Sequence, residues 1–259
     1  MADTLADAIA AIAAEAGALA LARWQTDFAR WEKVPGHPVC DIDLEVNTLL
    51  RTRLEALDPG AGWLSEETAD TAERLARDRL WVVDPIDGTR DYLRGRPGWS
   101  VSVALVEGGM PVVGVLDAPA RGEVWRAVRG AGATRNGVAL RASARTDLVG
   151  ACVPTDALPK ADRDLVIVDK PNSIALRIAM VAADEADLVA TARWGNEWDI
   201  AAAALIATEA GARITDALGG ALAFNTPAAE AFGILATAPG IHAAAAARLH
   251  ERALAASAR

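Results

Sequence analysis

The stretch LWVVDPIDGT, residues 80–89, decides the fold and the chemistry that we expect of this chain. The apolar run at its start predicts a buried strand with polar residues at its carboxyl end. Pro85 fixes φ and removes a backbone donor, so the chain turns there, and Asp84 and Asp87 can face the same small volume. Gly88 then allows the backbone to approach a ligand closely. The stretch therefore predicts a cluster of oxygen ligands at the end of a buried strand.

Three further acidic motifs can complete such a cluster. They are Asp41-Ile42-Asp43, Ser65-Glu66-Glu67 and Trp198-Asp199. Each motif alone has an ordinary structural explanation, because a turn, an exposed Glu pair or a helix N-cap needs no ligand. Together they match the preference of hard cations such as Mg²⁺ for carboxylates, water and substrate phosphate. An EF-hand over residues 84–95 is excluded, since Gly95 stands where that loop requires a bidentate Glu.

Charge and composition exclude several classes of protein. The 259 residues include 35 acidic and 26 basic side chains, which give a net charge of −9, and 52% are hydrophobic, as in globular proteins. Such an acidic chain has no broad basic face, which argues against a nucleic-acid polymer or an anionic membrane surface as partner. Asp7 and Glu15 interrupt the Ala-rich N-terminus, which has no basic start, so we expect neither a signal peptide nor a membrane span.

The scarcity of His and Cys narrows the chemistry further. His37, His242 and His250 lie near the ends of the chain, so a Ser-His-Asp triad or a HExxH zinc site has little to be built from. Cys40 and Cys152 do not make a disulfide framework and fit a reducing compartment, which predicts a cytoplasmic location. Carboxylates and hydroxyls would therefore carry any catalysis.

The apolar pattern divides the chain into an α+β half, residues 1–146, and an α/β half, residues 147–259, with the site between them. In the first half we expect helices at 4–23 and 42–56, a loop or hairpin at 32–40, a strand at 80–84 and strand hairpins from residue 99 onward. In the second half we expect strands at 149–153, 164–168, 187–192, 212–216 and 232–237, and helices at 173–183, at 199–211 and at the C-terminus. Asp91 and Asp117, near strand ends, are expected to be solvated or to cap.

Four segments resemble the motifs of the inositol monophosphatase superfamily, whose members are Mg²⁺-dependent, lithium-sensitive phosphomonoesterases. In chain order they are PVCDID (38–43), WLSEE (63–67), WVVDPIDGT (81–89) and WDIAAA (198–203), the last followed by Glu209-Ala210-Gly211. Their order and spacing are similar to those of the family. The resemblance implies a layered αβαβα sandwich of the inositol monophosphatase/fructose-1,6-bisphosphatase type, which in many members is a homodimer.

The resemblance also implies a site for two or three Mg²⁺ ions. The first ion would be held by Glu66, Asp84 and the backbone carbonyl of Ile86. Asp84 would bridge to a second ion, which Asp87 and Asp199 complete. Glu66 is also expected to reach a weaker third ion.

The catalytic and phosphate-binding roles follow from the same resemblance. Thr89, oriented by Asp43, would help to activate the attacking water together with the ion on Glu66. The backbone amides of Gly88 and Thr89 would cradle the phosphate. The implied reaction is an in-line displacement by metal-activated water, which needs neither His nor a covalent intermediate.

Three positions depart from the family pattern. Cys40 stands where Thr is usual, three residues before Asp43. Ser65 replaces a common Gly before the Glu pair, and Ala203 replaces a common Gly after Trp-Asp. The first departure concerns a side-chain hydrogen bond, and the last concerns packing.

Within the superfamily the chain looks most like the 3'(2'),5'-bisphosphate nucleotidases, which convert adenosine 3',5'-bisphosphate to AMP. Ala192 stands where inositol monophosphatases place a Glu that bonds inositol, and residues 65–67 and 89–95 look like the nucleotidase branch. Trp194 or Tyr92 could stack on an adenine. A second phosphate on the substrate would need cations, for which the candidates are Arg90, Arg94, Lys170, Arg177 and Arg193.

Two alternatives stay open. An inositol-1-monophosphatase, or another sugar or polyol phosphatase, would use the same metal site on a different small phosphorylated metabolite. A non-catalytic regulatory protein would bind a phosphate ligand on the same fold without turnover. Against the second alternative, every implied metal-ligand position is filled by a competent side chain.

Overall fold

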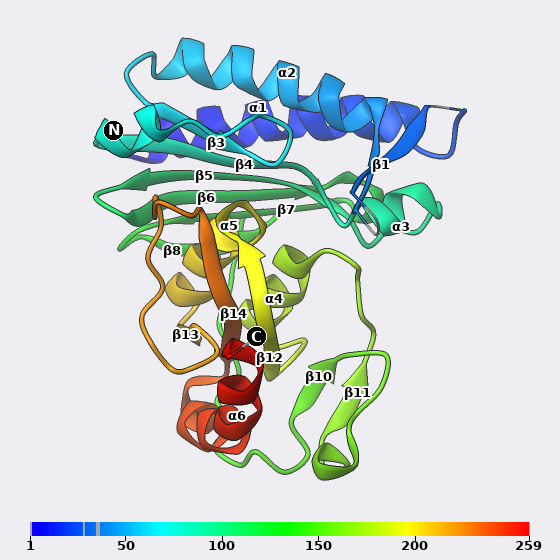
Figure 1. Cartoon of the computed structure of the whole chain (residues 1–259), viewed down its shortest axis with the longest axis vertical. Coiled ribbons are helices and arrows are strands. Elements are labelled where there is room, and N and C mark those ends of the chain that lie inside the picture. The colour runs from blue at the N-terminus through cyan, green and yellow to red at the C-terminus, as the bar shows by residue number, and fades with distance from the viewer. Residues whose placement is uncertain (1, 28, 35–36, 259) are drawn as a thin grey trace.

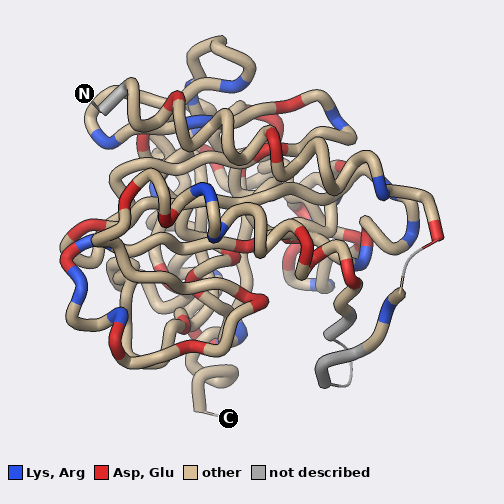
Figure 2. The backbone as a smooth tube through the Cα atoms, turned by 90° about the horizontal axis from the view of Figure 1, so that it is seen from above, with Lys and Arg blue, Asp and Glu red and all other residues tan. Residues whose placement is uncertain are grey.

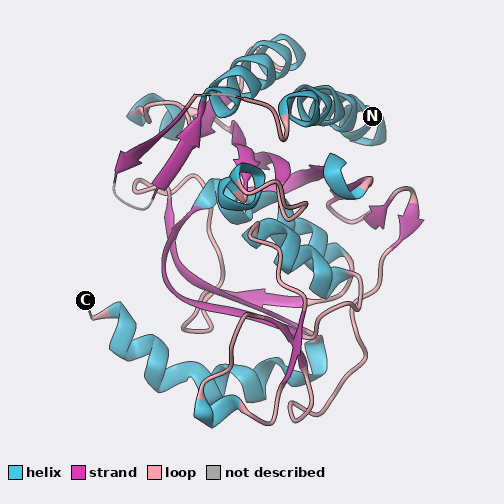
Figure 3. Ribbon diagram, turned by 90° about the vertical axis from the view of Figure 1, so that its right-hand side faces the viewer, coloured by secondary structure: helices cyan, strands magenta, loops and turns pink. Residues whose placement is uncertain are grey.

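Layers of helices and sheets alternate along the long axis of the molecule (Figure 1). The computed structural model describes residues 2–27, 29–34 and 37–258. From one end to the other the layers are α1 with α2, a seven-stranded sheet, α4 with α5, a three-stranded sheet, and α6. This order confirms the expected αβαβα sandwich. Figure 3 shows the same stack from the side, with α6 against the outer face of the smaller sheet.

The large sheet has the order β3-β4-β5-β6-β7-β8-β9, in which β3 and β4 are parallel and the other neighbours are antiparallel. Its strands are β3 (Gly62–Ser65), β4 (Arg79–Asp87), β5 (Ser100–Glu107), β6 (Met110–Ala118), β7 (Glu123–Val128), β8 (Gly132–Arg135) and β9 (Val138–Ala139). The small sheet is antiparallel, with the order β12-β14-β13. Its strands are β12 (Leu188–Asn196), β13 (Arg213–Thr215) and β14 (Glu230–Thr237).

The helices cover the sheets, and two short strand pairs lie beside them. The helices are α1 (Ala2–Arg23), α2 (Asp41–Leu57), α3 (Thr89–Leu93), α4 (Ile174–Ala182), α5 (Glu197–Glu209) and α6 (His242–Ser257). The pairs are an antiparallel hairpin of β1 (Arg30–Val34) with β2 (His37–Cys40), and a parallel pair of β10 (Cys152–Pro154) with β11 (Val166–Val168). Short 3₁₀ turns are η1 (Ala72–Ala76), η2 (Pro119–Arg121), η3 (Lys160–Asp162) and η4 (Pro239–Ile241).

The elements expected from the apolar pattern are present, and the largest differences in length lie near the acidic motifs. The expected loop or hairpin at 32–40 is the hairpin of β1 and β2, of which residues 35–36 lie outside the described residues. β4 continues through Pro85 to Asp87, because Asp87 still pairs with Ser100 of β5 after a register shift. β12 continues to Asn196, four residues beyond its expected end. The division at residue 146 stays a prediction.

α1 is long and apolar enough to cross a membrane by length and composition alone, and among the described helices it is the one that passes this test. Ile9, Ala13 and Ala16 on α1 are fully buried in a cluster with residues of α2 and of the large sheet. A core helix of a soluble protein passes the same test, so the test is weak evidence for a membrane span. Seen from the side of α1 and α2, acidic and basic residues are intermixed along the chain (Figure 2).

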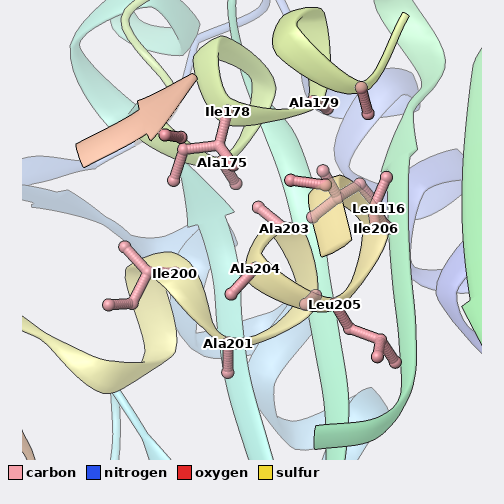
Figure 4. Close-up of a cluster of buried hydrophobic side chains, with 14 of the residues drawn as sticks. Leu116, Ala175, Ile178, Ala179, Ile200, Ala201, Ala203, Ala204, Leu205 and Ile206 are labelled. Carbon is pink, nitrogen blue, oxygen red and sulfur yellow. The ribbon is translucent and has the colours of Figure 1, made fainter. Parts of the chain in front are cut away.

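α5 is the central helix, and it is apolar on nearly all sides because it lies between two sheets. Figure 4 shows its Ala203 and Ile206 in one cluster with Ile178 of α4 and Leu116 of β6. The helix lies unusually close to β6 at Gly114, where an added Cβ would be 2.7 Å from the backbone oxygen of Ala202. Small residues on both elements therefore set the distance between α5 and the large sheet. Ala203, which departs from the family's Gly, is fully buried in this cluster.

Asp117 on β6 is buried, so the expectation of a solvated or capping side chain was wrong. Its exposed fraction is 4%, and its Oδ2 would lie only 1.7 Å from a Cβ added to Gly17 of α1. Burial raises the pKa of the Asp117 carboxyl to about 6. β6 runs on to Ala118 beneath α1, which places Asp117 inside the layer contact and away from solvent.

We predict that Gly114→Val destabilises the fold by about 1–3 kcal/mol, because the side chain must push α5 away from β6. Urea unfolding with equal m-values would measure the change. Gly60→Ala is the matched control, since its Cβ would meet only the Asp58 carboxylate at 3.5 Å. Equal midpoints for the two variants would show that the close approach of α5 is not a constraint.

Candidate active site

The carboxyl end of β4 places two aspartates in one buried corner. Asp84 and Asp87 are 1% and 7% exposed, and the register shift between β4 and β5 falls between them. The backbone amide of Ile86 donates to Asp84 Oδ1 at 3.0 Å. The expected turn at Pro85 was wrong, because β4 runs on to Asp87 and an irregularity between Asp84 and Asp87 takes the place of the turn. Both carboxylates still face the same small volume, as expected.

Gly88 is needed at the next position for two reasons. Its φ of 94° is left-handed, and an added Cβ would lie 2.6 Å from the carbonyl oxygen of Gly98 and 2.8 Å from the amide nitrogen of Ser173. α3 begins directly after it, at Thr89. The Thr89 hydroxyl donates to the Ile86 carbonyl at 3.0 Å, so the hydroxyl lies at the carbonyl that is the expected metal ligand. Both Gly88 and Thr89 line the cavity described below.

α5 brings the third aspartate. Asp199 is in the first turn of α5, where its Oδ2 accepts the backbone amide of Asn196 at 3.3 Å as part of a capping box. Asp84, Asp87 and Asp199 each offer one carboxylate oxygen, and these oxygens lie within 4.8 Å of one another. Residues that are more than 110 positions apart in the sequence thus meet at one point, as the motifs predicted.

Asp87 is also the anchor of α4. Its Oδ2 accepts the backbone amide of Ala175 at 2.8 Å and the Ser173 hydroxyl, while Oδ1 accepts only a long contact of 3.4 Å from Ile174. The start of a helix favours a carboxylate because its first amides are unpaired and its dipole is positive there. Oδ1 is therefore the oxygen with capacity for a further ligand.

Glu66 reaches the site from the end of β3, held by a polar network. Its backbone amide continues the pairing with β4 by donating to the Val83 carbonyl at 3.3 Å. Ser65, the departure from Gly, donates to Asn47 Oδ1 at 2.7 Å and accepts the amide of Glu67 at 3.3 Å. The hydroxyl at position 65 thus orders the turn that carries Glu66.

Asp43 is buried at the start of α2 and pairs with the other departure. Its Oδ2 accepts the backbone amide of Cys40 at 2.8 Å and the Cys40 thiol at 3.0 Å. The thiol therefore takes the donor role that the usual Thr hydroxyl would have. Burial, the Asp43 charge and this hydrogen bond raise the pKa of the Cys40 thiol, so the thiolate is disfavoured. The expected orientation of Thr89 by Asp43 stays a prediction.

Burial and mutual repulsion shape the charge of the site. Burial raises the pKa of Asp84 well above its ordinary value, and the neighbouring carboxylates raise it further; they are Glu66, Asp87, Asp199 and Asp43. Burial and the Asp87 charge raise the pKa of Asp199 to about 7. Burial also raises the pKa of Asp87, against the hydrogen bonds from α4. Carboxylates in such an arrangement stay ionised at neutral pH only with a compensating positive charge.

The donor set fits a divalent cation. The candidate ligand atoms are carboxylate oxygens and the Ile86 carbonyl, which suits hard cations such as Mg²⁺ and not soft ones. The pKa of each of the three clustered aspartates is raised without a cation, so binding a cation there would relieve a real repulsion. The metal ligands that the family resemblance implies and the oxygen donors that the structure brings together therefore indicate the same site.

A cavity of about 180 Å³ opens over the carboxylates and is bordered by three arginines. Arg90, Arg177 and Arg193 all line it. The Arg177 guanidinium is held by the carbonyls of Asn172 at 3.0 Å and Ser173 at 3.3 Å. Burial lowers the pKa of Arg177 and the nearby Arg193 charge lowers it further, while the Asp87 carboxylate opposes both.

The remaining substrate candidates lie elsewhere. Lys170 borders a second cavity on the other side of Arg177 and pairs with Asp156. Trp194 is 58% exposed on β12 and packs edge-on against Phe232. Tyr92 is buried and donates from its hydroxyl to the Ala20 carbonyl at 2.8 Å, so it is a core residue and not a stacking platform.

Two residues that shape the site were missed or misjudged from sequence. Ser173 was not singled out and was taken as the first residue of the helix expected at 173–183, although a Ser at a helix start is a capping signal that could have drawn attention to it. Asp91 was expected to be solvated or to cap a helix. The expectation of a solvated side chain was wrong, because Asp91 is 7% exposed and accepts the backbone amide of Asn172 at 2.9 Å. Asp91 therefore ties α3 to the segment that presents Ser173.

Comparisons with known proteins agree with this site. The model of the inositol monophosphatase family matches residues 1–259. Inositol monophosphatase 2 of Solanum lycopersicum is 33% identical over 201 residues, which cover 70% of this chain and 75% of the relative. A fructose-1,6-bisphosphatase/inositol-1-monophosphatase of Thermotoga maritima is 34% identical over 189 residues, covering 69% and 71%. The solved structure of a Thermotoga maritima IMPase superposes with a TM-score of 0.83 at 28% identity and covers 95% of this chain and 97% of its own.

The fold, the buried acidic cluster and these matches define a hydrolase that acts on phosphomonoesters. The chain belongs to the inositol monophosphatase family. Members of the family are metal-dependent, and this chain has an acidic cluster of Asp84, Asp87 and Asp199.

We predict that the metal-free protein loses stability as pH rises from about 4 to about 7. A carboxyl whose pKa is raised by folding binds more protons in the folded state than in the unfolded state, so stability falls as pH rises through that window. The pKa of Asp199, raised by burial and by the Asp87 charge to about 7, sets the upper end of this window, and the ordinary Asp pKa of about 4 sets its lower end. Thermal unfolding in EDTA should show a drop of roughly 5 °C or more, since 1 kcal/mol shifts Tm by about 2–4 °C in a chain of this size.

Asp84→Asn is the matched variant for this prediction. The substitution removes the most crowded charge, so the Tm of the variant in EDTA should fall less over this pH window than the Tm of the wild-type protein. Its turnover should drop by more than the roughly 10- to 100-fold that is typical when a residue that orients a metal ligand is changed. A variant with full turnover, or a wild-type Tm that rises over this pH range, would refute the assignment of the acidic cluster.

Proposed function

We propose that this chain is a Mg²⁺-dependent phosphomonoesterase whose substrate carries a second anionic group, with adenosine 3',5'-bisphosphate as the first candidate. One observation carries the proposal. The cavity that contains the clustered carboxylates is also bordered by Arg90, Arg177 and Arg193. A phosphate on bound metal uses the carboxylate side, and guanidinium groups bind a second phosphate with paired hydrogen bonds.

The side chains divide the work between cation and substrate. Glu66, Asp84 and the Ile86 carbonyl would hold one ion, and Asp84, Asp87 and Asp199 a second, with Glu66 available to a third. When bound, Mg²⁺ supplies a water of lowered pKa and stabilises the negative charge on the leaving oxygen. Thr89 would orient that water through its hydroxyl, and the amides of Gly88 and Thr89 would bind phosphate oxygens.

Position 192 supports a substrate other than inositol phosphate. Ala192 is exposed on β12 and offers no polar group where the inositol phosphatases of the family place a Glu. β12 has a register shift between Thr191 and Trp194, and a bulge of this kind redirects side chains. Arg193, in the bulge, lines the cavity in the place where a second anion would be bound.

Inositol 1-phosphate is the second candidate, because a tomato relative that is 33% identical bears the name inositol monophosphatase. Fructose 1,6-bisphosphate is a further bisphosphate to test, because the Thermotoga relative is named for that activity as well. A homodimer, lithium sensitivity and a cytoplasmic location stay predictions from the family resemblance.

We predict that purified protein with Mg²⁺ releases phosphate from adenosine 3',5'-bisphosphate far faster than from inositol 1-phosphate. Arg193→Ala should raise KM for the bisphosphate by roughly 10- to 100-fold, since a charged hydrogen bond contributes about 1.5–3 kcal/mol. Its KM for inositol 1-phosphate should change little.

Arg94→Ala is the matched control, because Arg94 is exposed and is not among the described residues that line the cavity. Faster hydrolysis of inositol 1-phosphate would overturn the bisphosphate proposal and favour the second candidate. No Mg²⁺-dependent release from any phosphomonoester would favour a non-catalytic phosphate-binding role.

A further inference from the structure

A buried acidic residue next to Asp199 takes no part in the acidic cluster. Glu197, the first residue of α5, is 0% exposed and lies two residues before Asp199. Its Oε2 accepts the amide of Asn225 at 2.7 Å, and its Oε1 accepts the amide and the hydroxyl of Thr226 at 2.8 Å and 2.6 Å. Glu197 therefore fixes the start of α5 to the loop of residues 224–229 with three hydrogen bonds.

A buried arginine holds the same loop from the other half of the chain. Arg74, on η1, is 2% exposed. It donates from Nη1 to Asn225 Oδ1 at 2.7 Å and from Nη2 to the Thr226 carbonyl at 2.9 Å. The other edge of its guanidinium pairs with Asp70 at 2.6 Å.

Loop 224–229 is thus clamped between η1 and α5. Its conformation is specific, since Asn225 has a left-handed φ of 60° and the Phe224 amide donates to the Gly109 carbonyl at 3.1 Å. The loop also closes on α5 through the Glu197 amide, which donates to the Ala229 carbonyl at 2.9 Å. η1 follows β3 and the turn of Glu66, so the clamp joins the chain segment of one candidate ligand to the helix of another.

Stability alone does not explain such a clamp. Two charged side chains, Arg74 and Glu197, are withdrawn from water, and the cost of burying a charge is often as large as the gain from its partners. What their bonds to loop 224–229 do fix is geometry: Asp199 comes from α5, whereas Asp84 and Asp87 come from β4. A shift of about 1 Å between these elements would change the distance between their carboxylates, and functional sites depend on that precision.

We propose that Arg74 and Glu197 are positioning residues that hold Asp199 against the β4 carboxylates and so set the affinity of the site for its divalent cation. The proposal rests on the metal assignment of the proposed function and does not depend on which phosphate ester is the substrate. Neither residue is among the described residues that line the cavity over the carboxylates, so we expect neither to contact a substrate bound there.

The test measures the Kd of Mn²⁺ for the full chain, by calorimetry and by electron paramagnetic resonance. Glu197→Gln keeps the shape of the side chain but removes one acceptor and the charge. We expect its Kd for Mn²⁺ to rise by about 10- to 100-fold, the range seen for residues that orient metal ligands. At saturating metal its KM for substrate should stay unchanged.

Glu209→Gln is the matched control on the same helix. At the opposite end of α5, Glu209 accepts the amides of Gly130 and Gly132, both at 2.9 Å, so it also ties α5 to the other half of the chain. This control should lose comparable stability and keep the wild-type Kd for Mn²⁺. Thr226→Val, which removes only the hydroxyl donor to Glu197, gives a milder form of the test if Glu197→Gln does not fold.

The outcomes separate the two proposals. A wild-type chain that binds no Mn²⁺ would overturn the metal assignment itself. A wild-type chain that binds Mn²⁺, with Glu197→Gln or Thr226→Val of equal affinity, would leave the metal assignment intact and overturn the positioning role. A matching loss of affinity in Glu209→Gln would also overturn it, because any loosening of α5 would then have the same effect.

Discussion

Repulsion between buried carboxylates is the constraint on which the rest of this structure depends. The oxygens of the buried Asp84 and Asp87 and of the half-buried Asp199 come within 4.8 Å of one another beneath the cavity, with Glu66 and Asp43 close enough to raise the pKa of Asp84. Left to itself, such an arrangement would spread apart or take up protons. The layers around it must therefore resist that spreading until a cation relieves it.

The surrounding elements resist it with packing and hydrogen bonds together. α4 binds Asp87 through Ser173 and the amide of Ala175, which fixes one carboxylate from behind. Close packing of α5 against Gly114 fixes the helix that carries Asp199 at its distance from the sheet. The fold thus holds the ligands ready before a cation arrives, which is what a preorganised site requires.

The layers and the joining of Asp199 to the cluster were predicted through the resemblance of four motifs to the family. The local pattern at Pro85 predicted that Asp84 and Asp87 face one small volume, which they do, although β4 continues through Pro85 instead of ending in a turn. The burial of a side chain by residues far away in the sequence could not be predicted in the same way. Asp91 and Asp117 sit near strand ends in the sequence, yet tertiary contacts with the Asn172 segment and with α1 bury them.

Which basic residues lie at the cavity also could not be predicted from the local sequence. Nothing in the local sequence separates Arg177 and Arg193, which border the catalytic cavity, from Lys170, which pairs with Asp156 beside another cavity. The register shift in β12 and the start of α4 bring Arg193 and Arg177 to the cavity, and α3 brings Arg90. Fold and ligand chemistry are therefore predictable here from motifs, whereas substrate recognition depends on the irregular features of the strands.

Anomalous scattering from crystals grown with Mn²⁺ would locate a divalent cation at Asp84, Asp87 and Asp199 without reference to activity. We expect an anomalous difference peak between these three carboxylates. Anomalous peaks only at other positions, with this corner occupied by water, would contradict it.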